Sequence, residues 1–276
     1  MKVRALLPLL ALAAPARAQK WFDSPLVVAT PTYEVRARGD LDGDGDVDLL
    51  RFYGGTSSGI WISCQALLND GTGRFSPGPT TSLPQSQNIA IRRPLLGDVT
   101  GDGVLDLVLT VSNSPTIRGV RLFPGTGGGA FGASVFFSLP GNPIDLVLRD
   151  LDGNGALDIG VLSFGAAADP TARWLSWNGA ALASSAVVSV PTLGAISLAA
   201  MDATGDGVPD LLVGEWFDPD VWVLPTVAGN PTLGSPLPIP GPVGAGRVVE
   251  AGDLDGDGDE DALVASDDYT TGLWFV

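Results

Sequence analysis

Aspartates recur at a fixed spacing in five short loops of this sequence. The first loop, DLDGDGDVD, begins at Asp40, and related nonapeptides begin at Asp98, Asp150, Asp202 and Asp253. Oxygen-bearing side chains stand at positions 1, 3, 5 and 9 of each loop, with glycine at positions 4 and 6. Oxygen ligands in a short loop suit Ca²⁺, usually with one backbone carbonyl added near position 7. Glycine permits the left-handed turns that bring alternate side chains to one centre. The loops therefore predict up to five bound Ca²⁺ ions, one per loop.

The predicted calcium ligands are the side chains at positions 1, 3, 5 and 9 and the carbonyl at position 7. They are Asp40, Asp42, Asp44, Asp46, Asp48, Asp98, Thr100, Asp102, Val104, Asp106, Asp150, Asp152, Asn154, Ala156, Asp158, Asp202, Thr204, Asp206, Val208, Asp210, Asp253, Asp255, Asp257, Asp259 and Asp261. Threonine at position 3 keeps an oxygen but loses a charge, so the second and fourth loops should bind Ca²⁺ more weakly. Mg²⁺ fits less well, because it retains its waters and demands stricter geometry.

An EF-hand and a simple solvated turn both fit the loops less well than a calcium-binding propeller loop. An EF-hand loop shares the opening D-x-D-x-D-G but needs glutamate at position 12 and flanking helices. Position 12 here holds Arg51, Leu109, Val161, Val213 and Val264. Aspartates that only form solvated turns would account for one loop, but five loops with every ligand position retained argue against such turns.

The spacing of the loops predicts a repeat architecture. Their starts are separated by 58, 52, 52 and 51 residues, which is typical of a propeller or another repeat array. An alternating segment precedes each loop, two apolar segments follow, and a weaker fourth segment follows a Gly-rich turn. Four short strands per repeat form one propeller blade. The sequence thus predicts an all-β protein, a five-bladed β-propeller in a single domain over residues 19–276. The last repeat lacks a fourth strand, and we expect residues 21–30 to supply it and close the ring.

These loops resemble the FG-GAP or VCBS repeats of integrin α-subunits and many secreted bacterial proteins. The stretch NDGTGRF, residues 69–75, is similar to the Gly-rich turn usual in VCBS repeats, whereas WNGAAL and AGNPTL in the third and fourth repeats depart from it. The resemblance implies a β-propeller with one Ca²⁺ per intact loop. It implies no single function, because such propellers serve in adhesion, in sugar binding and beside enzyme domains.

The N-terminus and the composition predict an exported acidic protein. Residues 1–18 have the basic start, the short apolar stretch and the small-residue cleavage site of a signal peptide. We therefore expect a secreted protein, extracellular, periplasmic or on the cell surface, with no membrane span. The net charge of −16 argues against nucleic acid or an anionic membrane as a partner. The chain has no histidine, which excludes Ser–His and Cys–His nucleophile pairs, and we expect its one cysteine, Cys64, to be a core residue.

The varied loops between the second and third strands are the predicted ligand-binding face. Aromatic, amide and carboxylate side chains there suit a carbohydrate or a surface protein. The candidate residues are Tyr53, Asn113, Glu215, Trp216, Phe217, Asp267 and Tyr269. An alternative is that Trp216 and Phe217 only pack between blades.

A binding or adhesion module is the function expected from this face. The alternative is a polysaccharide lyase or hydrolase that would use Glu215 with Asp218 or Asp267. However, 20 of the 31 acidic residues lie in the calcium loops, and no nucleophile motif accompanies the others. The sequence leaves the oligomeric state open.

Overall fold

The described part of the chain consists of β-strands and their connections. The structure is a computed structural model that describes residues 33–53, 62–83, 90–113, 117–164, 169–192, 194–216, 221–227, 230–239, 246–253, 256, 258, 260–266 and 274–275. All regular elements in these ranges are strands, so the predicted all-β fold is confirmed. Within the same ranges there is no helix long and apolar enough to cross a membrane.

Each of the five repeats forms one antiparallel sheet. Sheet one contains β1 (Tyr33–Gly39), β2 (Asp48–Tyr53), β3 (Ser63–Asn69) and β4 (Phe75–Ser82). Sheet two contains β5 (Ala90–Gly97), β6 (Asp106–Asn113), β7 (Ile117–Phe123) and β10 (Val135–Ser138). Sheet three contains β11 (Asn142–Arg149), β12 (Asp158–Phe164), β13 (Pro170–Trp177), β14 (Leu182–Ser184) and β15 (Val188–Ser189). Sheet four contains β16 (Ala195–Met201), β17 (Asp210–Glu215), β18 (Val221–Leu224) and β21 (Leu237–Ile239). Sheet five contains β22 (Gly246–Gly252), β23 (Asp261–Ser266) and β24 (Trp274–Phe275).

The acidic loops connect the first and second strands of the sheets. The residue before each loop pairs with its last aspartate, as Gly39 pairs with Asp48 and Gly97 with Asp106. Each loop therefore closes a hairpin, in the place expected from the sequence.

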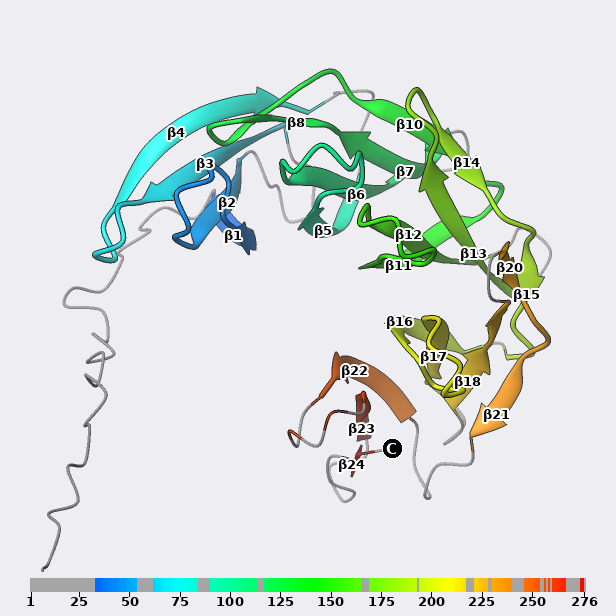
Figure 1. Cartoon of the computed structure of the whole chain (residues 1–276). Coiled ribbons are helices and arrows are strands. Elements are labelled where there is room, and N and C mark those ends of the chain that lie inside the picture. The colour runs from blue at the N-terminus through cyan, green and yellow to red at the C-terminus, as the bar shows by residue number, and fades with distance from the viewer. Residues whose placement is uncertain are drawn as a thin grey trace, which may run out of the picture.

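The sheets follow one another in an arc (Figure 1). The first strands β1, β5, β11, β16 and β22 lie on the inner side, and each contacts the first strand of the next sheet. The arc is open between β1 and β22 in this view. Residues 21–30, expected to complete the last sheet, lie outside the described residues, so a closed ring of five blades stays a prediction.

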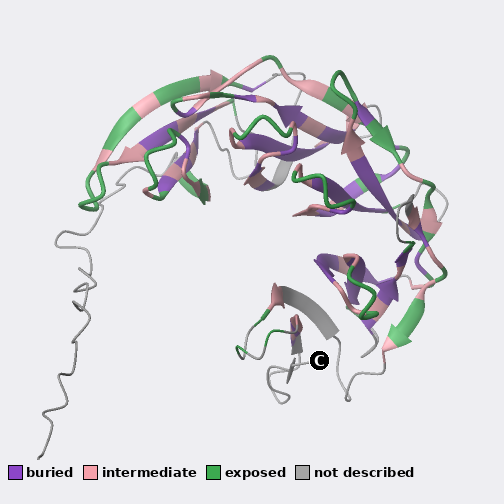
Figure 2. Cartoon of the chain, in the orientation of Figure 1, coloured by how far each residue is buried: buried purple, intermediate pink, exposed green. Residues whose placement is uncertain are grey.

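A separate apolar cluster fills each joint between neighbouring sheets, where the buried residues gather (Figure 2). Representative residues of the four clusters, in chain order, are Phe52 and Leu109, then Leu122 and Ile159, then Trp174 and Leu211, and finally Leu212 and Ala262. Cys64 belongs to the first cluster and is fully buried, as expected. Burial raises the pKa of its thiol to about 12. Because the clusters are separate, each joint is stabilised by its own buried surface.

Every first strand contains a register shift against the second strand. The shifts lie between Val35 and Ala37, Arg92 and Leu95, Pro143 and Asp145, Ala195 and Ser197, and Val248 and Glu250. A β-bulge bends its strand and increases the local twist. The repeated shift therefore bends the inner strand of each sheet.

Two short hairpins, which the sequence did not predict, precede the fourth strands of sheets two and four. They are β8 (Gly125–Gly127) with β9 (Ala130–Phe131), and β19 (Thr226–Val227) with β20 (Asn230–Leu233). The first hairpin reaches back to sheet one, where Gly129 N donates to Leu41 O at 2.8 Å. The second reaches sheet three, where Trp174 Nε1 donates to Thr226 Oγ1 at 3.2 Å. Both hairpins thus add polar contacts across a joint between sheets.

Candidate metal sites and the opposite face

The glycines of the acidic loops adopt the left-handed backbone expected from the sequence. In the first loop the φ angles are 84° at Gly43 and 90° at Gly45, and the same two positions have positive φ in the other four loops. Residues with a Cβ rarely adopt this conformation. The ten loop glycines therefore share one left-handed backbone conformation.

The first aspartate of each loop holds this turn by accepting backbone N–H groups. Asp40 Oδ1 accepts from Gly43 N at 2.7 Å, and its Oδ2 accepts from Gly45 N at 2.9 Å. The same two bonds recur at Asp98, Asp150 and Asp202, with distances of 2.7–2.9 Å. Each carboxylate oxygen has two acceptor sites, so an oxygen that accepts one N–H can still bind a cation.

In the first four loops the last aspartate is buried, and it ties the loop to neighbouring backbone. Asp106 is fully buried, and its Oδ2 accepts from Val99 N and Thr100 N, both at 2.8 Å. Its Oδ1 accepts from Gly125 N, beyond β7, at 2.7 Å. Asp48 and Asp210 have corresponding backbone bonds, to the loop and to residue 69 or 226. These carboxylates have a scaffolding role that the ligand pattern did not reveal.

Three carboxylates converge in the first and third loops. One oxygen each of Asp40, Asp42 and Asp48 lies within 4.8 Å of the other two, and the same holds for Asp150, Asp152 and Asp158. Oxygens that bind one Ca²⁺ at 2.3–2.6 Å can be at most about 5 Å apart. Both groups therefore have the donor type and the spacing that Ca²⁺ requires, and they combine positions 1, 3 and 9.

The position 5 side chains lie outside these two three-carboxylate groups. Asp44 Oδ1 accepts from Asp46 N at 2.9 Å, and Asn154 Oδ1 accepts from Ala156 N at 2.7 Å. In the second and fourth loops, Thr100 and Thr204 replace the position 3 carboxylate, and their N–H groups donate to the last aspartate. Asp255, Asp257 and Asp259 of the fifth loop lie outside the described residues.

Comparison with known proteins gives a family match for the first part of the chain. Residues 40–109 and 98–161 each match the FG-GAP-like repeat. This segment carries FG-GAP-like repeats. Among solved structures, the chain is similar to one described as "Structure of Dos1 propeller", with 9% identity and a TM-score of 0.47 over 82% of this chain and 64% of that chain. No curated protein matches the chain.

Desolvation governs the electrostatics of the acidic loops. Burial raises the pKa of the last aspartates Asp106, Asp158 and Asp210 above the usual range, and hydrogen bonds to them oppose that rise. At exposed Asp42, desolvation and the neighbouring Asp44 and Asp48 also raise the pKa. A bound cation would favour the ionised form of each of these carboxyl groups.

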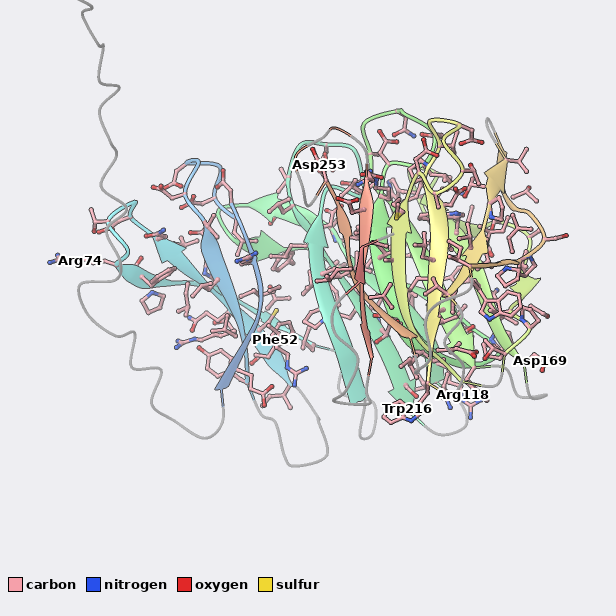
Figure 3. The ribbon with its side chains drawn as sticks, turned by 90° about the horizontal axis from the view of Figure 1, so that it is seen from below. Phe52, Arg74, Arg118, Asp169, Trp216 and Asp253 are labelled. Carbon is pink, nitrogen blue, oxygen red and sulfur yellow. The ribbon has the colours of Figure 1, made fainter. Side chains whose placement is uncertain are left out.

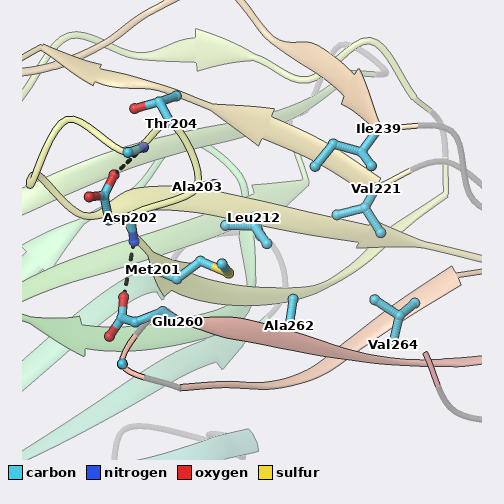
Figure 4. Close-up of a pocket in the computed structure, with 12 residues that line it drawn as sticks. Met201, Asp202, Ala203, Thr204, Leu212, Val221, Ile239, Glu260, Ala262 and Val264 are labelled. Carbon is cyan, nitrogen blue, oxygen red and sulfur yellow. Dashed lines mark hydrogen bonds between the residues drawn. The ribbon is translucent and has the colours of Figure 1, made fainter. Parts of the chain in front are cut away.

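Glu260, at position 8 of the fifth loop, links three sheets. Its Oε2 accepts from Asp202 N, the first residue of the fourth loop, at 3.0 Å, and its Oε1 forms an ion pair with Arg149. Glu260 also lines a cavity of about 480 Å³ between sheets four and five, together with Asp202, Thr204 and apolar residues such as Met201 and Leu212 (Figure 4). Glu260 and Asp202 thus stand at the polar end of an otherwise apolar space.

The predicted ligand face lies at the opposite end of the sheets. Figure 3 shows Trp216, Arg118 and Asp169 at the end away from Asp253. Trp216 is 46% exposed, and its backbone N–H donates to Gly194 O at 2.8 Å. Asp169 is also exposed. An aromatic ring and a carboxylate are therefore accessible at one end of the molecule.

The remaining predicted ligand-binding residues differ in their surroundings. Glu215 is only 2% exposed, so its carboxylate offers little surface to a ligand. The Tyr53 hydroxyl donates to Gln65 Oε1, and the Arg51 guanidinium lies 5.0 Å from the centre of its ring. Phe217, Asp267 and Tyr269 lie outside the described residues, as does the side chain of Asn113.

Proposed function

We propose that this protein is a secreted, calcium-stabilised β-propeller that acts as a binding or adhesion module. The observation that carries the proposal is the convergence of three carboxylates in the first and third loops. The FG-GAP-like match over residues 40–161 supports it, because such repeats often bind Ca²⁺. Export is proposed from residues 1–18 alone.

Calcium titration of the purified protein tests the metal sites. Replacing Asp42 and Asp152 by Asn removes one exposed carboxylate from each three-carboxylate group and leaves the buried aspartates in place. The double variant should lose two Ca²⁺ ions from the binding stoichiometry, or bind them at least about tenfold more weakly. Asp169→Asn is the matched control, because it removes an equally exposed charge far from the loops. Equal calcium binding by all three proteins would contradict the proposal.

The proposed ring contains five blades, with residues 21–30 as the last strand of sheet five. Support comes from the one apolar cluster at each of the four joints and from the three strands described in sheet five. Closure would also remove the open sheet edge at the end of the chain. Small-angle X-ray scattering of the calcium-loaded protein should then give a radius of gyration of about 19 Å, as expected for a compact chain of this length.

The proposed partner is a carbohydrate or a surface protein, bound at the end that carries Trp216. An exposed aromatic ring stacks well on the apolar face of a sugar, and a nearby carboxylate accepts hydrogen bonds from its hydroxyls. Binding to a glycan array in the presence of Ca²⁺ should be lost in Trp216→Ala. Phe136→Ala is the control, because Phe136 is 36% exposed on β10, in sheet two rather than in the sheet that carries Trp216. Binding that survives in Trp216→Ala and fails in Phe136→Ala would place the partner elsewhere.

A further inference from the structure

The joints between sheets one, two and three repeat one contact. The last residue of each first strand is a glycine, and a leucine at position 8 of the next loop packs against it. A Cβ at Gly39 would lie 2.6 Å from Leu105 Cδ1, and a Cβ at Gly97 would lie 2.6 Å from Leu157 Cδ1. The glycines thus leave the space that the leucines of the following sheet fill.

The next two joints have neither partner of this contact. Arg149 and Met201 replace the glycine, and Pro209 and Glu260 occupy position 8 of the following loops. Between sheets four and five a polar contact is formed, because Glu260 accepts from Asp202 N at 3.0 Å and pairs with Arg149. Of these four joints, the two that have glycine before a loop also have a branched apolar residue at position 8 of the next loop. The other two joints have neither residue.

The two ends of the arc carry the two halves of this contact. Val47, at position 8 of the first loop, is a branched apolar residue and is 54% exposed. Gly252 precedes the fifth loop, and a Cβ there would meet no atom within 4 Å. Among the described residues, one end of the arc thus presents an exposed apolar side chain, and the other presents a glycine with no atom packed beside it.

We propose that Val47 packs against Gly252 of the same chain and that this contact joins sheet five to sheet one. The proposal rests on the closed ring proposed above and names the residues that meet in it. The same chain is the expected occupant because the arc already brings β22 round toward the side of β1 (Figure 1). A contact between copies would be head-to-tail, and unless its rotation closed a ring it would leave a free Val47 and a free Gly252 and generate open chains of molecules.

Photo-crosslinking from position 47 tests the contact. A diazirine-bearing aliphatic amino acid replaces Val47 in the full chain with Ca²⁺, and mass spectrometry locates the labelled peptide. Labelling within residues 246–253 of the same molecule is expected. The same amino acid at Leu105 is the positive control and should label β1 or β5, because Leu105 already lies against Gly39. At exposed Asp44 it should label neither segment.

Two outcomes would overturn the proposal. Labelling of a second molecule would assign Val47 to an interface between copies, and labelling outside residues 246–253 while the Leu105 control works would exclude the contact. Scattering separates these results from failure of the ring itself. A compact radius of gyration without the cross-link refutes only this contact, whereas an extended one refutes the closed ring.

A thermal melt provides a second measurement. Val47→Gln should lower the melting temperature by several degrees, because a polar side chain would then occupy an apolar joint. Val187→Gln is the matched control, since Val187 is 48% exposed and far from position 8 of any loop. Equal and small shifts in the two variants would contradict burial of Val47.

Discussion

The aspartate that ends a loop accepts backbone N–H groups, and in the first and third loops it also belongs to a three-carboxylate group. In Asp106 both oxygens accept backbone N–H groups, from the loop on one side and from Gly125 on the other. One oxygen each of Asp48 and Asp158 also belongs to a three-carboxylate group. The sequence pattern predicted these aspartates as calcium ligands but not as buried acceptors of backbone N–H groups, because a pattern of ligands does not show which side chain becomes buried.

Comparison of Asp106→Asn with Asp102→Asn separates the scaffolding role of the last aspartate from its proposed role in calcium binding. Asp106→Asn should lower the free energy of unfolding of the metal-free protein by about 2–3 kcal/mol, because a buried charged acceptor is replaced by an amide. Asp102 is exposed, so its replacement should change that free energy by less than about 0.5 kcal/mol. Denaturant unfolding in the presence of chelator measures both values. Equal losses in the two variants would contradict a scaffolding role for Asp106.

The pH dependence of calcium binding follows from the same burial. Burial raises the folded-state pKa of Asp106, Asp158 and Asp210, so protonation stabilises the metal-free fold below the unfolded-state pKa, and that contribution is lost as pH rises through the folded-state pKa. Ca²⁺ needs the ionised carboxylate and therefore competes with the proton. The rise in melting temperature caused by Ca²⁺ should shrink between pH 7 and pH 4, beginning above the usual aspartate range. A constant rise over this interval would refute the competition.

At the scale of the loops and strands, the sequence predicts what repeats and misses what does not. The acidic loops, their left-handed glycines and their position between the first and second strands all follow from the spacing of aspartate and glycine. The hairpins β8–β9 and β19–β20 do not follow from this spacing. Each occurs in one repeat only and is held by contacts to a neighbouring sheet. The contact of Gly39 with Leu105 is predictable only in part. Aligning the repeats shows that glycine and leucine recur at these positions, but it does not show that they touch.

Exchanging the position 3 residues should transfer calcium affinity between loops. Thr100→Asp adds a carboxylate to the second loop and should tighten its Ca²⁺ binding about tenfold, whereas Asp152→Thr should weaken the third loop by a similar factor. Calorimetric titration of the two variants and the parent protein resolves the change. Unchanged affinities would show that position 3 does not contact the ion.

The packing of Gly97 against the next sheet predicts that a second substitution should relieve the destabilisation caused by Gly97→Ala. A Cβ at Gly97 would meet Leu157 Cδ1 at 2.6 Å and Leu148 Cδ1 at 2.8 Å, so Gly97→Ala should destabilise the fold by about 1–3 kcal/mol. Adding Leu157→Ala to Gly97→Ala should cost less than the sum of the two single changes, because the smaller side chain leaves room for the methyl group. A double-mutant cycle by denaturant unfolding gives the coupling. Strict additivity would contradict the packing contact.

At the scale of the whole molecule, stability is divided among the joints, and the loops lie at the ends of the strands that form them. Folding therefore builds the three-carboxylate groups, and a cation that binds only the folded chain stabilises the whole array. The sequence predicted the five repeats and their order from the loop spacing. It also predicted closure of the ring by residues 21–30, which stays a prediction, because closure depends on the rotation between successive sheets and these residues lie outside the described ones.

Removal of calcium should lower the melting temperature of the intact protein. Two sites held at about 100-fold above their dissociation constants contribute about 5 kcal/mol, which corresponds to a shift of about 10–20 °C for a chain of this size. Differential scanning calorimetry with excess Ca²⁺ and with chelator measures the shift. An unchanged melt at saturating chelator would refute the calcium sites, and Mg²⁺ in place of Ca²⁺ should restore little of the loss.

If the protein is exported as proposed, burial of the thiol between the first two sheets has a chemical consequence. Oxidising surroundings normally drive a lone cysteine into mixed disulfides or covalent dimers. Cys64 avoids this because it is fully buried and burial raises its pKa to about 12, so almost no reactive thiolate is present while the two sheets stay packed. If the joint opens, even briefly, the exposed thiol can form such a disulfide. The fraction of molecules with oxidised Cys64 therefore reports how often this joint has opened. In aged preparations that fraction should grow with the time spent without calcium.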